Sequence, residues 1–305
     1  MVIRKISYYR VIVSLCLFMF LLSPVFGDEI SAVSFDKELP ENNIVTIQPD
    51  SLRILHNPLT GWVLYASMGV DAADFWAQYD HMYIPELGHN VSVTDYAHTL
   101  YIRASWTDFN PQEDVYGWKI DSNLRAYIEG AYQRNMRLAF RVVVDSRDKR
   151  TEFTPQFVKD AGAKGFMNKG KWSPYSDDSV FQKYYTKFVK ALAKDFNDPS
   201  KVEFIDGFGL GKWGEYHTMI YSTGDDTPKK AVFDWVTDIY SQAFDKVPVV
   251  INYHRWIGAG KDWVDDEHFA ADSEEMLEEA IKKGYSLRHD AFGMTTYYGS
   301  WERRF

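Results

Sequence analysis

Cysteine is almost absent from this chain of 305 residues, in which only Cys16 occurs. It lies in an apolar run near the N-terminus that we expect to be removed from the mature protein. The mature chain would then have no disulfide, no thiol nucleophile and no cysteine ligand for a metal. An exported protein without disulfides fits a bacterial periplasm or cell surface better than a disulfide-rich secreted scaffold.

Residues 1–27 are typical of a secretory signal peptide. Basic residues precede the apolar segment 11–22, and small residues stand before Asp28, which gives a plausible cleavage site. The apolar segment is too short to cross a membrane comfortably. A retained N-terminal anchor is the alternative, although Leu15 before Cys16 does not suit lipoprotein cleavage. We expect a secreted, periplasmic or cell-surface protein with no stable membrane insertion after cleavage.

Several motifs that would indicate other functions are missing. The sequence has no glycine-rich phosphate loop between a strand and a helix, no His-Glu-x-x-His and no Gly-x-Ser-x-Gly. The acidic segment 262–267 lacks the spacing of a calcium loop. A net charge of −9 argues against a nucleic-acid groove. We therefore expect no cofactor, no metal and no nucleic-acid partner.

Strands and helices alternate along most of the chain, which predicts βα units and a parallel sheet. Residues 28–56 are expected to form a leader with short capping strands, and residues 57–305 the main domain. The segment 146–178 shows no clear period and is expected to be a lid or a disordered loop. The expected strands are 61–67, 99–106, 138–145, 202–209, 248–253 and 287–293, and the expected helices are 71–79, 120–134, 179–196, 228–244 and 273–283 with Ser273 as its N-cap.

This pattern predicts an α/β fold, a (β/α) barrel of the TIM type. A closed barrel has eight strands, and six are found before the end of the sequence. We expect a barrel that is incomplete at its C-terminus. Missed strands, a longer parent protein, an open sheet and a fragment that folds poorly alone are the alternatives.

Residues 202–217 form the most informative segment. An apolar run opens into glycines and then presents Trp213, Glu215, Tyr216 and His217. In barrels of this kind the active site lies at the carboxyl ends of the strands. Aromatic rings can stack on a sugar, and 16% of the chain is aromatic. A carboxyl group among such rings is suited to general acid–base catalysis, and a polar loop residue is the alternative.

Residues 100–118 resemble the second-strand region of clan A glycoside hydrolases, the β-galactosidase and cellulase-like barrels. The strand ends in Arg and Trp, and a Pro-Gln-Glu-Asp-Val-Tyr-Gly-Trp turn follows. The segments 57–62, 211–217 and 287–293 also resemble poorly described bacterial barrel proteins. This resemblance spans roughly residues 57–293 and implies that Glu215, after the fourth strand, is the acid/base. Gly214 replaces the asparagine of the clan, and no seventh strand is visible to carry the nucleophile.

Further site residues follow from their places near strand ends. Asp290 is the candidate second carboxylate, and a salt bridge with Arg288 or Arg103 is the alternative. If it faces Glu215, we expect a separation of about 6.5–9.5 Å, as in inverting enzymes. The other candidates are Trp106, Trp213, Tyr216, Trp256 and Trp301 as sugar platforms or edge-of-core side chains, Asn252 and His254 as hydroxyl ligands, His217 as a tuning or structural residue, and Arg103 as the residue that orients a carboxylate.

These observations predict an exported glycoside hydrolase that cleaves the O-glycosidic bonds of an oligo- or polysaccharide. The alternative is a non-catalytic glycan-binding barrel in the periplasm or at the cell surface. A second carboxylate within reach of Glu215 would favour the enzyme.

Overall fold

The computed structural model describes residues 61–66, 68–145, 152–252, 257–260 and 272–288. They belong to one compact unit, residues 54–305. The expected signal peptide and the capping strands within residues 28–56 lie outside the described residues. Among the helices of the described ranges, none combines the length and the apolar character needed to cross a membrane.

A six-stranded parallel sheet forms the centre of this unit. Its strands follow one another across the sheet in the order in which they occur along the chain. They are β1 (Trp62–Ala66), β4 (Ala97–Ser105), β5 (Arg137–Val143), β8 (Val202–Asp206), β9 (Val249–Asn252) and β10 (Tyr285–Arg288).

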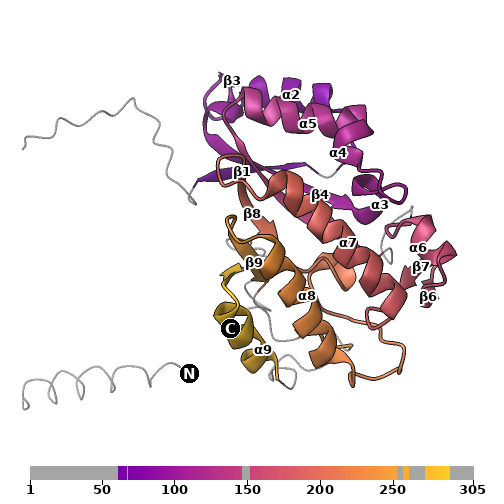
Figure 1. Ribbon diagram of the computed structural model, residues 1–305. Coiled ribbons are helices and arrows are strands. Elements are labelled where there is room, and N and C mark those ends of the chain that lie inside the picture. The colour runs from indigo at the N-terminus through magenta and orange to yellow at the C-terminus, as the bar shows by residue number, and fades with distance from the viewer. Residues whose placement is uncertain (1–60, 67, 146–151, 253–256, 261–271, 289–305) are drawn as a thin grey trace, which may run out of the picture. The chain divides into compact units, whose positions relative to one another are not determined.

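One main helix lies in each connection between neighbouring strands. These helices are α2 (Ala72–Asp80), α5 (Ser122–Gln133), α7 (Ser179–Phe196), α8 (Lys229–Ala243) and α9 (Ser273–Lys282). Because crossover connections are right-handed and the strand order never reverses, successive helices lie on the same face of the sheet (Figure 1). This is a partial (β/α) barrel, which confirms the expected fold class.

The two faces of the sheet differ in chemistry because successive side chains of a strand point to opposite sides. On β4, Leu100 and Ile102 belong to the hydrophobic core with residues of the helices. Tyr101 and Arg103, which alternate with them, make their polar contacts with other strands and with the loop after β8. The face away from the helices is called the inner face below.

Smaller elements lie in the connections between the strands of the sheet. The hairpin β2–β3 (Met82–Ile84 and His89–Val91) and the turn η2 (Val93–Asp95) lie between α2 and β4, and the short helices α3 (Trp106–Phe109) and α4 (Gly117–Ile120) follow β4. The segment 152–178 contains α6 (Gln156–Asp160) and the hairpin β6–β7 (Gly165–Asn168 and Lys171–Pro174). The expectation of a disordered loop is therefore wrong for residues 152–178, while the expectation that the segment is a lid stays a prediction.

Local signals explain most element ends. Helix α7 begins after Asp178, whose side chain accepts from the backbone N–H of Phe181 at 2.9 Å, and its bounds match the expected ones. The expected helix 120–134 is divided because Asp121 caps α5 by accepting from the Leu124 N–H at 2.7 Å. Helix α9 differs in its start. Asp272 occupies the N-cap position with a φ of 66°, and Ser273 is the first helical residue and not the cap.

Candidate functional site

Asp206, the last residue of β8, is fully buried and accepts several hydrogen bonds on the inner face. Its carboxylate accepts from Arg141 Nε at 2.8 Å, from Arg288 Nη1 at 2.8 and 3.0 Å, and from the hydroxyl of Tyr101. Burial, and next the Asp206 charge, raise the pKa of Tyr101 well above its usual value, so this tyrosine remains a neutral donor. A buried carboxylate is tolerated because two cations and a hydroxyl surround it.

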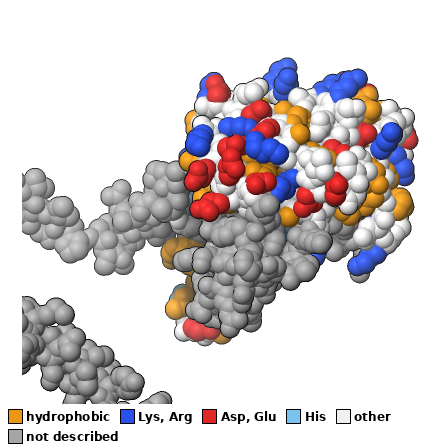
Figure 2. Space-filling model, turned by 90° about the horizontal axis from the view of Figure 1, so that it is seen from below, with side chains coloured by type: hydrophobic (Ala, Val, Ile, Leu, Met, Phe, Trp, Pro, Cys, Tyr) orange, Lys and Arg blue, Asp and Glu red, His pale blue; other side chains and the backbone are white. Residues whose placement is uncertain are grey.

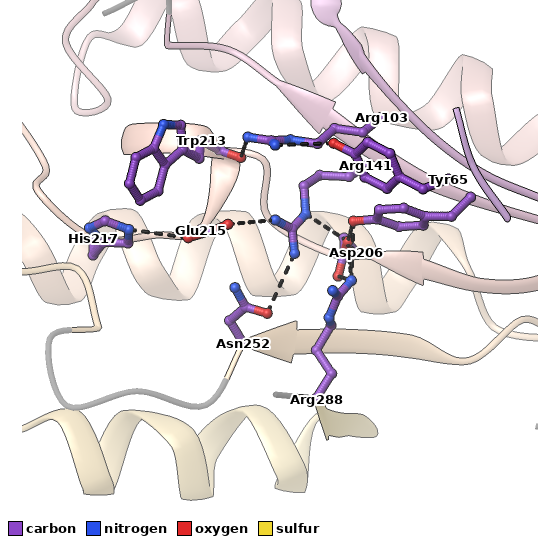
Figure 3. Close-up of polar contacts among 10 residues, drawn as sticks. Tyr65, Arg103, Arg141, Asp206, Trp213, Glu215, His217, Asn252 and Arg288 are labelled. Atoms are coloured by element: carbon purple, nitrogen blue, oxygen red, sulfur yellow. Dashed lines mark hydrogen bonds and ion pairs between the residues drawn. The ribbon is translucent and has the colours of Figure 1, made fainter. Parts of the chain in front are cut away.

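Arg141, on β5, links this buried cluster to the loop after β8 (Figure 3). Its guanidinium group is buried, and Nη1 lies 3.0 Å from Oε1 of Glu215. Its Nη2 donates to Oδ1 of Asn252, at the end of β9, at 3.5 Å. One guanidinium therefore contacts both carboxylates and joins three elements. The residues Tyr101, Arg141, Asp206, Glu215, Asn252 and Arg288 are called the Arg141 network below.

The loop that carries Glu215 has an unusual backbone. Trp213 and Tyr216 have positive φ angles of 59° and 61°, which are uncommon for residues other than glycine. The loop is held by a bond from Tyr216 N to Leu210 O at 2.9 Å. Strained backbone of this kind is found preferentially at functional sites. Here it leaves the Glu215 side chain 20% exposed, whereas Asp206 is inaccessible.

His217 completes the surroundings of Glu215. Its Nε2 lies 3.3 Å from Oε2 of Glu215, and its Nδ1 lies 2.8 Å from Oγ1 of Thr218. The imidazole packs against the ring of Trp213 at 5.7 Å between centroids and at 72° between planes. Each oxygen of Glu215 thus has its own nitrogen partner, Arg141 on one side and His217 on the other (Figure 3).

Arg103, on β4, fixes the same loop from the other direction. Its Nη2 donates to the backbone carbonyl of Trp213 at 2.9 Å, and its Nη1 donates to the hydroxyl of Tyr65 at 3.2 Å. Tyr65 belongs to β1, so the site draws on β1, β4, β5, β8, β9 and β10.

The structure brings five of the expected site residues to one place, namely Glu215, Arg103, Trp213, His217 and Asn252. Asp290, His254, Trp256 and Trp301 lie outside the described residues, so the structure gives no distance between Glu215 and Asp290. Within the described ranges, no group of three or more His, Cys, Asp and Glu residues is arranged to hold a metal ion.

Two expected sugar platforms are corrected because neither ring can be reached. Trp106 is 0% exposed and packs in a cluster that includes Tyr185, at 5.2 Å between ring centroids. Tyr216 is also 0% exposed, and its ring lies between Phe208 and Phe233. Both are core side chains, which was the alternative for each.

Sequence reasoning missed the residues that organise the network, above all Arg141, Asp206, Tyr101 and Tyr65. Arg288 was considered only as a partner of Asp290. A signal was present, because Arg141 and Asp206 are charged residues within apolar strands and such charges are rarely buried unless paired.

No family model and no curated protein matches the sequence. Among solved structures, an endo-1,4-β-xylanase from Caldicellulosiruptor owensensis is similar with a TM-score of 0.43 and 13% identity over 79% of this chain and 64% of that one. An exo-β-1,4-mannosidase from Opitutaceae bacterium strain TAV5 has a TM-score of 0.40 and 15% identity over 62% and 31%. Endo-glycoceramidase II from Rhodococcus sp. has a TM-score of 0.41 and 12% identity over 70% and 56%. This chain spans less than two thirds of each of these three proteins.

Proposed function

We propose that this chain is a glycoside hydrolase domain with Glu215 as its general acid/base. The observation that carries the proposal is the contrast between two carboxylates on one guanidinium. Asp206 is sealed in the core, while Glu215 is partly exposed at the carboxyl end of β8, beside Trp213. In a parallel (β/α) arrangement this end of the sheet is where catalytic groups are found.

The surrounding residues have distinct roles in this proposal. Arg141 and His217 hold the two oxygens of Glu215 in place, and Asp206 holds the Arg141 guanidinium group in its orientation. The ion pair with Arg141 is formed by the carboxylate form of Glu215, and His217 Nε2 at 3.3 Å is a partner for proton exchange. Trp213 supplies an aromatic surface for a sugar ring. Asn252 lies within reach of the same guanidinium and is a candidate ligand for a hydroxyl group.

Most glycoside hydrolases use two carboxyl groups. In the proposed reaction Glu215 protonates the glycosidic oxygen as the bond to the anomeric carbon breaks, and the positive charge develops on the sugar ring. The second group then acts as a nucleophile or activates a water molecule. Asp206 is too deeply buried for this task, and we assign it to Asp290 as a proposal.

A non-catalytic glycan-binding protein is the second candidate. It is favoured by one observation, that both oxygens of Glu215 already contact nitrogen atoms while the other network carboxylate is inaccessible. Such a protein would use Trp213 and Asn252 for binding and would need Glu215 only to hold the loop.

The test compares wild type with Glu215→Gln on a panel of oligosaccharides, by release of reducing ends and by calorimetric binding. As an enzyme, the wild type should cleave a member of the panel, and the variant should lose about 10²- to 10⁴-fold in rate while it retains binding. Glu113→Gln, a change at an exposed ion pair, is the control and should retain full activity. Binding that depends on Trp213 but is never followed by cleavage would support the glycan-binding candidate instead.

Export is a separate proposal that rests on residues 1–27 alone. N-terminal sequencing of the protein recovered from a secretion-competent bacterial host should give a chain that begins at Asp28. A product that retains Met1 in the membrane fraction would contradict it.

A further inference from the structure

The cations near Trp213 and the two arginines of the Arg141 network differ in the groups that neutralise their charge. Arg141 and Arg288 both contact the Asp206 carboxylate. Arg103 contacts only neutral oxygen atoms within the described part of the chain, namely the Tyr65 hydroxyl and the Trp213 carbonyl. Arg103 therefore brings a positive charge to the inner face without a carboxylate partner among the described residues.

Lys212 adds a second cation beside the same tryptophan. Its Nζ lies 4.2 Å from the centroid of the Trp213 ring, and in the described ranges its side chain makes no hydrogen bond or ion pair. By contrast, Arg134 is paired with Asp80 and Arg137 with Glu203, both away from this site. Two cations that have no acidic partner among the described residues thus lie beside Trp213.

Among the described residues of the Arg141 network and its surroundings at Trp213, the balance of charge is opposite to that of the chain. Three arginines (Arg103, Arg141 and Arg288) face two carboxylates (Asp206 and Glu215), and Lys212 increases the excess. The whole chain carries a net charge of −9. On the face drawn in Figure 2, acidic and basic side chains are interspersed over the described surface. The excess of positive charge at Trp213 is therefore a local feature.

The contacts of Arg103 with the described residues use only some of its donors. A guanidinium group has five N–H donors, and the contacts with Tyr65 and Trp213 use two of them. The group is partly buried, and a partly desolvated cation is stabilised by an anion that approaches it. The planar arrangement of its N–H groups matches the two oxygens of a carboxylate or a sulfate.

We propose that the glycan bound at Trp213 carries an oxyanion, either the carboxylate of a uronic acid or a sulfate ester, and that Arg103 binds it with support from Lys212. This inference rests on the part of the proposed function that places a glycan at Trp213. It does not require that the glycan be cleaved.

The test measures binding by titration calorimetry in the Glu215→Gln protein, so that no substrate is consumed. The probes are a galacturonate hexasaccharide, a chondroitin sulfate hexasaccharide and neutral cellohexaose. One of the two anionic probes should bind at least about tenfold more tightly than cellohexaose, and this difference should shrink as salt is added. The anionic probe that binds identifies the source of the oxyanion.

Variants assign the effect to the two cations. Arg103→Gln should weaken binding of the anionic probe by about tenfold or more, because a charge-assisted hydrogen bond is lost, and should weaken binding of cellohexaose clearly less. Lys212→Gln should act in the same direction with a smaller effect, and it carries the test if Arg103→Gln does not fold. Arg125→Gln, at an exposed ion pair on α5, is the control for a lost surface charge.

Three outcomes would overturn the inference. The first is that cellohexaose binds as tightly as the anionic probes or more tightly, and the second is that neither anionic probe binds. The third is that Arg103→Gln loses the same affinity for anionic and neutral probes, which would mean that Arg103 only positions the Trp213 loop. Tight binding of an anionic probe that wild type never cleaves would support the inference while contradicting the proposed hydrolysis. Cleavage of neutral glycans alone would support the proposed hydrolysis and contradict the inference of an anionic glycan.

Discussion

The Nη1 atom of Arg141 lies 3.0 Å from Oε1 of Glu215, so that a strand residue and a loop residue 74 positions apart form one ion pair. The same guanidinium group contacts Asp206 in the core through Nε at 2.8 Å. The position of the exposed carboxylate of Glu215 is therefore coupled to the buried charge of Asp206. A substitution at Asp206 should shift Glu215, and a substitution at Glu215 should change the surroundings of Asp206.

The first prediction concerns Arg141→Met. Removing one partner of a buried ion pair costs about 3–5 kcal/mol, and we expect the lower end of this range because Arg288 still contacts Asp206. Urea unfolding at neutral pH measures the loss. Arg125→Met, which breaks an exposed pair with Glu129, should cost no more than about 0.5 kcal/mol. Equal losses in the two variants would show that the Arg141 network contributes little to stability.

The regular elements were predictable because their signals are local. Helix α7 has a capping Asp178 and a buried face with the period of a helix, and its bounds agree with those expected from the sequence. The strands of the sheet are largely apolar runs that alternate with helices, and a helix was expected at each place where one of the five main helices lies. Each of these signals lies within a few residues of the element that it describes.

The Arg141 network was not predictable in the same way, because it depends on which residues face each other across strands. Arg103 is paired in register with Arg141, and Asp206 with Val250. The sequence contains the charges but not this register. Trp106 was misassigned for a related reason. Ser105 caps a short helix directly after β4, and this turn directs the indole into the core instead of over the site.

The second prediction concerns Tyr185→Phe. Burial raises the pKa of Tyr185 well above its usual value, so its hydroxyl is a neutral donor. It donates to the carbonyl of Phe208, in the loop after β8, at 3.0 Å, and it lies 2.8 Å from the hydroxyl of Tyr240. Loss of this hydroxyl should reduce the free energy of unfolding by about 1–3 kcal/mol. Tyr184→Phe is the matched control, because its hydroxyl has no hydrogen-bond partner in the described ranges, and it should be close to neutral. A larger loss for Tyr184→Phe would contradict the role assigned to Tyr185.

The third prediction concerns Gly209→Ala. Gly209 has a φ of +74°, and an added methyl group would lie 2.4 Å from the Tyr185 hydroxyl and 2.5 Å from the Val142 carbonyl oxygen. Gly224 has a similar φ of +79° with open space around it. Gly224→Ala should therefore cost only the strain of the left-handed backbone, about 1–2 kcal/mol. Gly209→Ala should cost clearly more because of the added clash, as measured by thermal or urea unfolding. Equal losses of stability in Gly209→Ala and Gly224→Ala would contradict the close packing described around Gly209.

The fourth prediction concerns the pH dependence of the pair between Asp80 and Arg134. The hydrogen bond from Arg134 is the main cause that lowers the pKa of Asp80 below its ordinary 3.8. A carboxylate with a lowered pKa in the folded state contributes stability above its unfolded pKa, and this contribution is lost as the pH falls through the folded value. At pH 7, Asp80→Asn should therefore be less stable than wild type by about 1 kcal/mol, as measured by urea unfolding. This difference should shrink as the pH is lowered below about 4.

Glu129→Gln, at an exposed pair, serves as the control. A difference between wild type and Asp80→Asn that stays constant from neutral to acidic pH would mean that its origin is packing, such as the contact of Arg134 with the Trp76 ring, and not the charge of Asp80.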